Sequence, residues 1–143
     1  MFSKDESEKL RTQFWTSFGK SFPKKWLLYN TKIKGFAFKF FADRKKAMVC
    51  LDIDMKNTDL RLQYYNKMLS LKNILTNQYI KDIIFDDNYI LDNGKSIIRI
   101  YIPLSKKFSI HNKNSWRDAY EFFVLNMNQF ELFWYEYEDF IKS

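Results

Sequence analysis

Residues 36–56 read FAFKFFADRKKAMVCLDIDMK, and the alternation within this stretch decides the fold. Alternation of apolar residues is typical of a strand with one buried face. A hairpin closed through the polar run 43–46 pairs Phe40 with Val49 and Phe36 with Ile53. A slip of one residue would turn one strand's apolar set to the opposite face, so the pattern fixes the register. The residues that share the predicted buried face are Phe36, Phe38, Phe40, Val49, Leu51 and Ile53.

Three helices and a second hairpin are predicted around this one. The apolar spacing predicts helices over residues 4–21, 58–78 and 116–142, the last with a near-heptad stripe. A short strand is expected within residues 26–33. Asn93-Gly94 predicts a second hairpin with a two-residue turn, in which Tyr89 pairs with Ile98. The expected fold is a two-layer α+β domain of order αβββαββα, whose mostly antiparallel sheet of two hairpins and a short strand is packed by three helices.

Length and charge place limits on the function. The 143 residues predict a single domain, 1–143, and the one cysteine cannot form an intramolecular disulfide. No leader or membrane-spanning run is recognised, so a cytoplasmic protein without a membrane partner is expected. The formal charge is +7, and because residues 131–143 carry a net −3, the rest of the chain carries +10. Such a basic body favours nucleic acid or another anionic partner.

The aspartates of the opening stretch suggest a nuclease as one interpretation. A helix, three strands, a helix and a strand is also the order of the restriction-endonuclease-like fold, in which carboxylates hold Mg²⁺ beside a lysine. Asp43 lies about 30 Å along the strand from Asp54, too far to share a metal. The alternative therefore rests on Asp52 and Asp54 with Lys39 or Lys56, and Mg²⁺ would be its only cofactor. The simpler interpretation is an ion pair between Asp52 and Lys39, which lies diagonally across the hairpin.

Basic residues next to aromatic ones suggest contact with nucleic acid. Lysines neutralise phosphates, and aromatic faces stack on unpaired bases. One cluster surrounds the sequence KSFPKKWLLYNTKIK (20–34), and the other lies at the tip of the first hairpin. The predicted contact residues are Lys20, Lys24, Lys25, Trp26, Tyr29, Lys32, Lys34, Arg44, Lys45 and Lys46.

Other residues carry less information. His111 is the only histidine and has no histidine or cysteine near it in the sequence, so it is expected to be structural. Cys50 is expected to pack as a small apolar residue. The stripe of the helix at 116–142 is expected to lie across the sheet, and part of this helix is a candidate homodimer contact.

Three blocks together resemble the bacterial domain of unknown function 4268 family: FWTSFGK (14–20), FKFFADRKKAMVCLDIDMKNTDLR (38–61) and LFWYEYEDF (132–140). The resemblance implies a free-standing domain, or the C-terminal part of longer chains whose N-terminal region resembles a restriction-endonuclease-like domain. It implies a nucleic-acid or defence context and supplies no catalytic residues. We therefore expect a non-catalytic, nucleic-acid-associated binding module, with the Mg²⁺-dependent nuclease and a structural homodimeric subunit as alternatives that leave enzymatic activity open.

Overall fold

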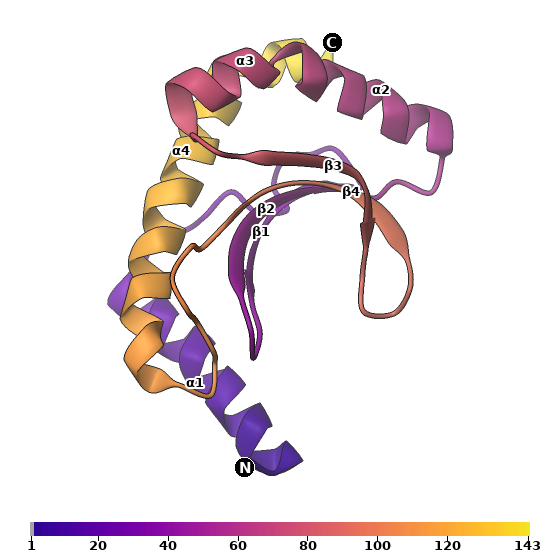
Figure 1. Ribbon diagram of the computed structural model, residues 1–143. Coiled ribbons are helices and arrows are strands. Elements are labelled where there is room, and N and C mark those ends of the chain that lie inside the picture. The colour runs from indigo at the N-terminus through magenta and orange to yellow at the C-terminus, as the bar shows by residue number, and fades with distance from the viewer. Residues whose placement is uncertain (1) are drawn as a thin grey trace.

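The computed structural model describes residues 2–143, which form one four-stranded antiparallel sheet covered by helices (Figure 1). The strand order is β1-β2-β4-β3, so the two hairpins meet between β2 and β4. This is the two-layer α+β architecture expected from the sequence. The elements in chain order are α1 (Lys4–Ser21), β1 (Phe36–Ala42), β2 (Ala47–Ile53), α2 (Thr58–Ser70), α3 (Lys72–Ile74), a single π-helical turn η1 (Leu75–Tyr79), β3 (Ile84–Ile90), β4 (Ser96–Pro103), a short 3₁₀ turn η2 (Lys113–Ser115) and α4 (Trp116–Lys142).

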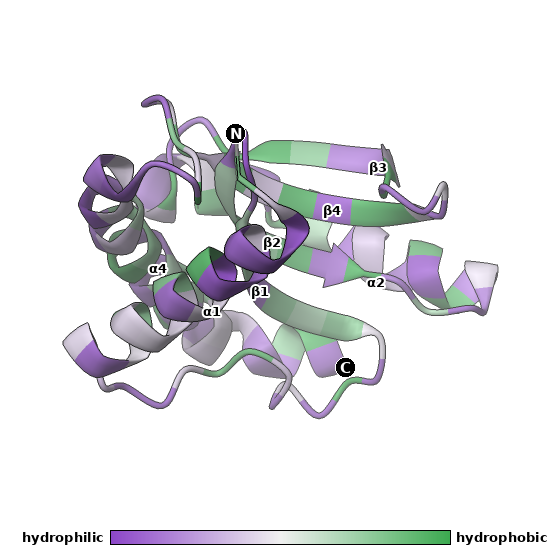
Figure 2. Cartoon of the chain, turned by 90° about the horizontal axis from the view of Figure 1, so that it is seen from below, coloured by the Kyte–Doolittle hydropathy of each residue, from purple (hydrophilic) through white to green (hydrophobic). Residues whose placement is uncertain are grey.

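The first hairpin has the register that the alternation predicts. Phe36 pairs with Ile53, Phe40 with Val49, and the remaining partners follow in step. Asp43 closes the turn, because its Oδ1 accepts the backbone N–H groups of Lys45 and Lys46 at 2.7 and 2.8 Å. The strands form the most hydrophobic part of the chain, whereas α1 presents a largely hydrophilic surface (Figure 2).

The core lies between the apolar face of the sheet and the helices. Phe38 packs against Phe130 and Trp134 of α4, with ring centres 5.2 and 6.0 Å apart. Phe14 of α1 is fully buried beneath Tyr120, whose hydroxyl donates to the carbonyl oxygen of Phe14. The helices at 4–21 and 116–142 therefore have their predicted bounds and bury their predicted stripes.

Residues 26–33 do not form the predicted strand. They form turns in which Leu28 and Lys32 have φ values of 42° and 63°, and a strand requires negative φ. The segment still runs beside β1, because the Phe38 N–H donates to the Leu28 carbonyl at 3.1 Å. Buried Thr31 fixes it further by donating to the Phe36 carbonyl at 2.6 Å. Two strands rather than three thus precede α2, one fewer than the restriction-endonuclease-like order requires.

The predicted helix at 58–78 is divided. It ends at Ser70, restarts as α3 and closes with the wide turn of η1. A π turn inserts one extra residue and so shifts the helical phase. This shift brings Tyr79 against Phe133 of α4, with ring centres 5.5 Å apart.

The predicted pairing of the second hairpin is wrong by one residue near the turn. It is wrong by two residues on the far side of a bulge between Asp86 and Tyr89. Tyr89 pairs with Ile97 rather than Ile98, and Asp86 pairs with Arg99 across a bulge. Only Gly94 in the turn has positive φ, at 86°, and the Leu91 N–H donates to the Lys95 carbonyl. These features describe a three-residue loop ending in a left-handed glycine, in place of the expected two-residue turn.

The sheet is strongly curved, and the helices lie on its outer, convex side (Figure 1). Phe41 on β1 and Arg99 on β4 are two strands apart and four residues apart in register, because Phe41 pairs with Met48 and Met48 with Pro103; their backbones would lie about 16 Å apart in a flat sheet. The Phe41 ring centre nevertheless lies 5.7 Å from the Arg99 guanidinium carbon. Curvature thus draws side chains of non-adjacent strands together on the inner face, on the side away from the helices.

Gly35 and Gly94 provide a test of the close packing at the start of β1. Both have φ above +80°, where a Cβ costs about 1–2 kcal/mol. A Cβ at Gly35 would also lie 2.6 Å from Cγ of Met55, whereas one at Gly94 meets nothing within 4 Å. Gly35→Ala is therefore expected to lower the free energy of unfolding in urea by more than Gly94→Ala does. Equal losses would contradict the contact with Met55.

Candidate binding site on the inner face of the sheet

The centre of the inner face carries a buried ion pair. Arg99 of β4 and Asp52 of β2 are directly opposed in the sheet and are 4% and 2% exposed. Arg99 Nε donates to Asp52 Oδ1 at 2.7 Å, and Nη2 donates to Oδ2 at 2.9 Å. Lys39 of β1 approaches Oδ2 at 3.4 Å, as the diagonal position predicted. Three strands thus contribute one charge each to a single network.

Burial and the charge of Asp52 shift the pKa of Arg99 in opposite directions. Burial in the sheet disfavours its charged form, but the hydrogen bonds and the charge of Asp52 outweigh this effect, so the pKa of Arg99 is raised. Arg99 therefore remains a cation, and the two Asp52 oxygens remain occupied. Arg99 donates to Asp52 through Nε and Nη2. Its third nitrogen, Nη1, can therefore donate to another acceptor.

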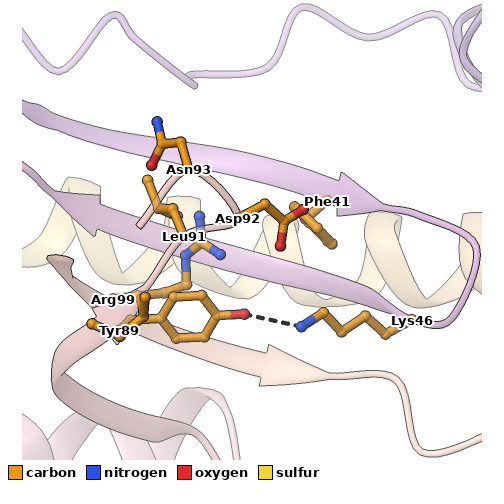
Figure 3. Close-up of a pocket in the computed structure, with 8 residues that line it drawn as sticks. Phe41, Lys46, Tyr89, Leu91, Asp92, Asn93 and Arg99 are labelled. Carbon is orange, nitrogen blue, oxygen red and sulfur yellow. Dashed lines mark hydrogen bonds between the residues drawn. The ribbon is translucent and has the colours of Figure 1, made fainter. Parts of the chain in front are cut away.

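A pocket opens beside Arg99, between β1 and the β3–β4 loop (Figure 3). The Tyr89 ring stacks over the guanidinium at 4.4 Å, and Phe41 lies on its other side. Lys46 Nζ donates to the Tyr89 hydroxyl at 3.2 Å, and this hydrogen bond is the main cause of the raised pKa of Lys46. We name this pocket of about 310 Å³ the aromatic pocket; its lining is Phe41, Lys46, Tyr89, Ile90, Leu91, Asp92, Asn93 and Arg99.

A larger and more basic hollow adjoins the aromatic pocket. It has a volume of about 600 Å³ and lies between α1, the β1–β2 turn and the loop around Ile110. Lys46 and Asp92 line both spaces, so the two are contiguous. His111 contributes its ring, whose Nε2 lies 2.9 Å from Ser7 Oγ. We name this hollow the basic rim after its cationic members Arg11, Arg44, Lys45 and Lys46.

The residues of the nuclease alternative, and Asp43, are partly committed to other contacts. Asp52 is bound by Arg99 and Lys39, and Asp43 is bound to the backbone of its own turn. Asp54 follows β2, and Lys56 is exposed beyond it. Within residues 2–143, no three or more His, Cys, Asp or Glu side chains cluster closely enough to hold a metal ion. The expected ion pair between Asp52 and Lys39 is present, with Arg99 as its stronger member.

The predicted nucleic-acid residues divide between two places. Lys24, Lys25 and Trp26 line a groove with the C-terminal half of α1, where Lys24 pairs with buried Glu131 at 2.9 Å. Glu131 also accepts the Leu27 N–H, so Lys24 serves to hold this segment on α4. The hairpin-tip cluster lies together in the basic rim and consists of Arg44, Lys45 and Lys46. Lys20 lines a hollow on another face of α1. The remaining predicted residues are exposed in the turns before β1: Tyr29, Lys32 and Lys34.

The outward face of α4 also bears on the expected homodimer. The predicted stripe is buried against the sheet and cannot serve a second copy. Leu125, Leu132 and Tyr135 instead project outward, each more than half exposed. A homodimer through residues 116–142 stays a prediction, and this outward row is where its contact would lie.

Sequence reasoning missed Arg99 and Tyr89 as site residues. An arginine in the middle of SIIRIYIP (96–103) was the available signal, because a charge inside an apolar strand requires a partner. That partner is Asp52, which lies 47 positions away and meets Arg99 only when β2 pairs with β4.

Comparison with known proteins identifies the family of this chain. The fold and its buried network define a small α+β domain with an open inner face. The family model described as "Domain of unknown function (DUF4268)" matches residues 10–138, so the chain belongs to this family, as its sequence blocks indicated. Neither the curated proteins nor the solved structures gave a match. None of the helices within residues 2–143 is long and apolar enough to cross a membrane.

Removing one member of the Asp52–Arg99 ion pair should strongly destabilise the protein. Asp52→Ala leaves the Arg99 charge buried without its main partner, and we expect a loss of about 3–5 kcal/mol in the free energy of unfolding. The double variant Asp52→Leu, Arg99→Met should recover most of this loss, because two apolar side chains can replace a buried pair. Asp118→Ala, which removes an exposed pair with Lys106, is the control and should change stability by less than about 1 kcal/mol. Similar losses for Asp52→Ala and Asp118→Ala in urea titrations would contradict the network.

Cys50 should make stability fall at alkaline pH. Burial raises the pKa of its thiol from 9.0 to about 12. Between these values the unfolded chain loses the proton and the native chain keeps it, so stability is complete below pH 9 and falls as pH rises. Cys50→Ala should therefore reduce the decline in unfolding free energy above pH 9 by up to about 1.4 kcal/mol per pH unit. Identical slopes for the two proteins would contradict the burial of the thiol.

Proposed function

We propose that the chain is a non-catalytic binding module for nucleic acid, and that the basic rim contacts the phosphates. The observation that carries the proposal is the gathering of Arg11, Arg44, Lys45 and Lys46 around one hollow. Arg44 and Lys45 are exposed at the tip of a rigid hairpin, and neither has a carboxylate partner within residues 2–143. Cations held without such partners are suited to neutralise phosphates.

The geometry favours binding over catalysis. A nuclease site needs carboxylates with open coordination positions, and the central carboxylate, Asp52, is bound by Arg99 through both of its oxygens. The two acids of the basic rim are Asp43 and Asp92, and Asp43 is committed to its own turn. The net charge of +7 also supports association with a polyanion.

Neutralising the hairpin tip should weaken binding in a salt-dependent manner. The wild type should bind labelled 12-nucleotide DNA and RNA in fluorescence anisotropy, with the logarithm of affinity falling linearly with the logarithm of salt over about 50–200 mM. Arg44→Gln, Lys45→Gln removes two phosphate contacts and should reduce the slope by about 1.4 on single strands. Denaturing gels after incubation with Mg²⁺ should show intact oligonucleotide.

The matched control is Lys56→Gln, Lys81→Gln, which removes the same charge from two exposed lysines outside the basic rim. The control should retain the wild-type slope. If both double variants reduce the salt dependence of affinity by the same amount, binding depends on net charge and not on the basic rim. No salt-dependent binding by the wild type would overturn the proposed function.

A further inference from the structure

The aromatic pocket has a chemical character different from that of the basic rim. Its one fully buried charge, Arg99, is already neutralised by Asp52. Its walls are the rings of Phe41 and Tyr89, the apolar side chains of Ile90 and Leu91, and the polar ends of Asp92 and Asn93. A phosphate would gain little beside Arg99, because Asp92 repels it and Asp52 offsets the charge of Arg99; the other cation of the pocket, Lys46, also lines the basic rim. A flat, apolar group with polar edges fits these walls better.

Arg99 holds the two rings that form the contact surface for such a group, because Tyr89 and Phe41 lie on the two sides of its guanidinium. Its guanidinium is held rigid by two hydrogen bonds to Asp52 and by the Tyr89 ring stacked 4.4 Å away. Guanidinium planes and aromatic rings are the two surfaces on which proteins stack unpaired bases. Nη1 of Arg99, the carboxylate of Asp92 and the amide N–H groups of Asn93 supply donors and acceptors for the edge of a base, whereas Asn93 Oδ1 already accepts the Lys95 N–H at 2.9 Å. Figure 3 shows these groups converging on one space.

The connection to the basic rim determines what the ligand must be. Lys46 and Asp92 line both spaces, so a phosphate beside Lys46 is next to the mouth of the aromatic pocket. Lys46 is fixed there by its hydrogen bond to the Tyr89 hydroxyl at 3.2 Å. One nucleotide can thus contact the rim through its phosphate and the pocket through its base.

We propose that the aromatic pocket binds one unpaired base of a single-stranded nucleic acid whose phosphates lie along the basic rim. This inference rests on the proposed function and adds the strand state of the ligand. A paired base cannot enter, because its edge is occupied by its partner and its faces are covered by its neighbours in the stack.

The test compares three 12-nucleotide DNA ligands in fluorescence anisotropy at one salt concentration. They are a single strand, the same strand in a duplex, and a single strand with six consecutive abasic positions, which keeps every phosphate. The single strand should bind about tenfold more tightly than the abasic strand, since stacking of one base contributes about 1–3 kcal/mol. It should also bind more tightly than the duplex.

The variant Phe41→Leu removes one ring and keeps an apolar side chain. It should lower affinity for the single strand about tenfold and leave affinity for the abasic strand unchanged. Tyr135→Leu, which removes an exposed ring on α4, is the matched control and should change neither. If Phe41→Leu does not fold, the wild type still decides the question, because 2-aminopurine in the single strand should lose fluorescence on stacking in the pocket.

The outcomes separate this inference from the proposed function. Equal binding of all three ligands, lost in Arg44→Gln, Lys45→Gln, would overturn the base pocket and leave the phosphate-binding rim standing. Tighter binding of the duplex would also overturn the base pocket. Absence of binding to every ligand would overturn both proposals.

Discussion

The ion pair between Arg99 and Asp52 is the constraint around which the inner face is organised. A charge in the middle of a strand is unfavourable unless it is paired and hydrogen-bonded, and two buried charges of the sheet, Asp52 and Arg99, face each other across β2 and β4. The pair favours β2 and β4 as neighbours, because this pairing places the Arg99 guanidinium against both Asp52 oxygens, with Lys39 of β1 and Asp86 of β3 on either side. The hydrophobic faces determine that a sheet forms, and this pair helps to determine its strand order.

Curvature and the ion pair support each other. A flat sheet would leave Met48, Cys50 and Ile97 open to water, because the helices cover only the other face. In the curved sheet these residues are buried, although they lie outside the main core. On the same face, Lys39 and Arg99 meet at the Asp52 carboxylate, and the Tyr89 ring centre lies 4.4 Å from the Arg99 guanidinium carbon. The aromatic pocket opens on this face beside the β3–β4 loop.

The parts of the fold that depend on nearby residues were predictable, and those that depend on distant ones were not. The register of the first hairpin and the bounds of α1 and α4 follow from alternation, capping and helical spacing. The segment 26–33 was misassigned because its turns are fixed by Glu131 and the edge of β1, which no local pattern reveals. The second hairpin was shifted because Asn93-Gly94 also suits a three-residue loop, and the bulge before Tyr89 leaves no trace in the sequence. Of the candidate site, Asp52, Lys39 and the hairpin-tip cations were identified, whereas Arg99 and Tyr89 required the pairing of β4.

The ion pairs of the basic residues distinguish the cations that stabilise the structure from those that remain available to a ligand. Lys24 is paired with Glu131, and Lys39 and Arg99 are paired with Asp52, so these cations stabilise the structure. Arg44 and Lys45 have no such role, yet the turn that carries them is held firmly by Asp43. A rigid turn lowers the entropy lost when its side chains bind a ligand. The cations of the hairpin tip therefore leave positive charge available to a partner beside the basic rim, which adjoins the aromatic pocket.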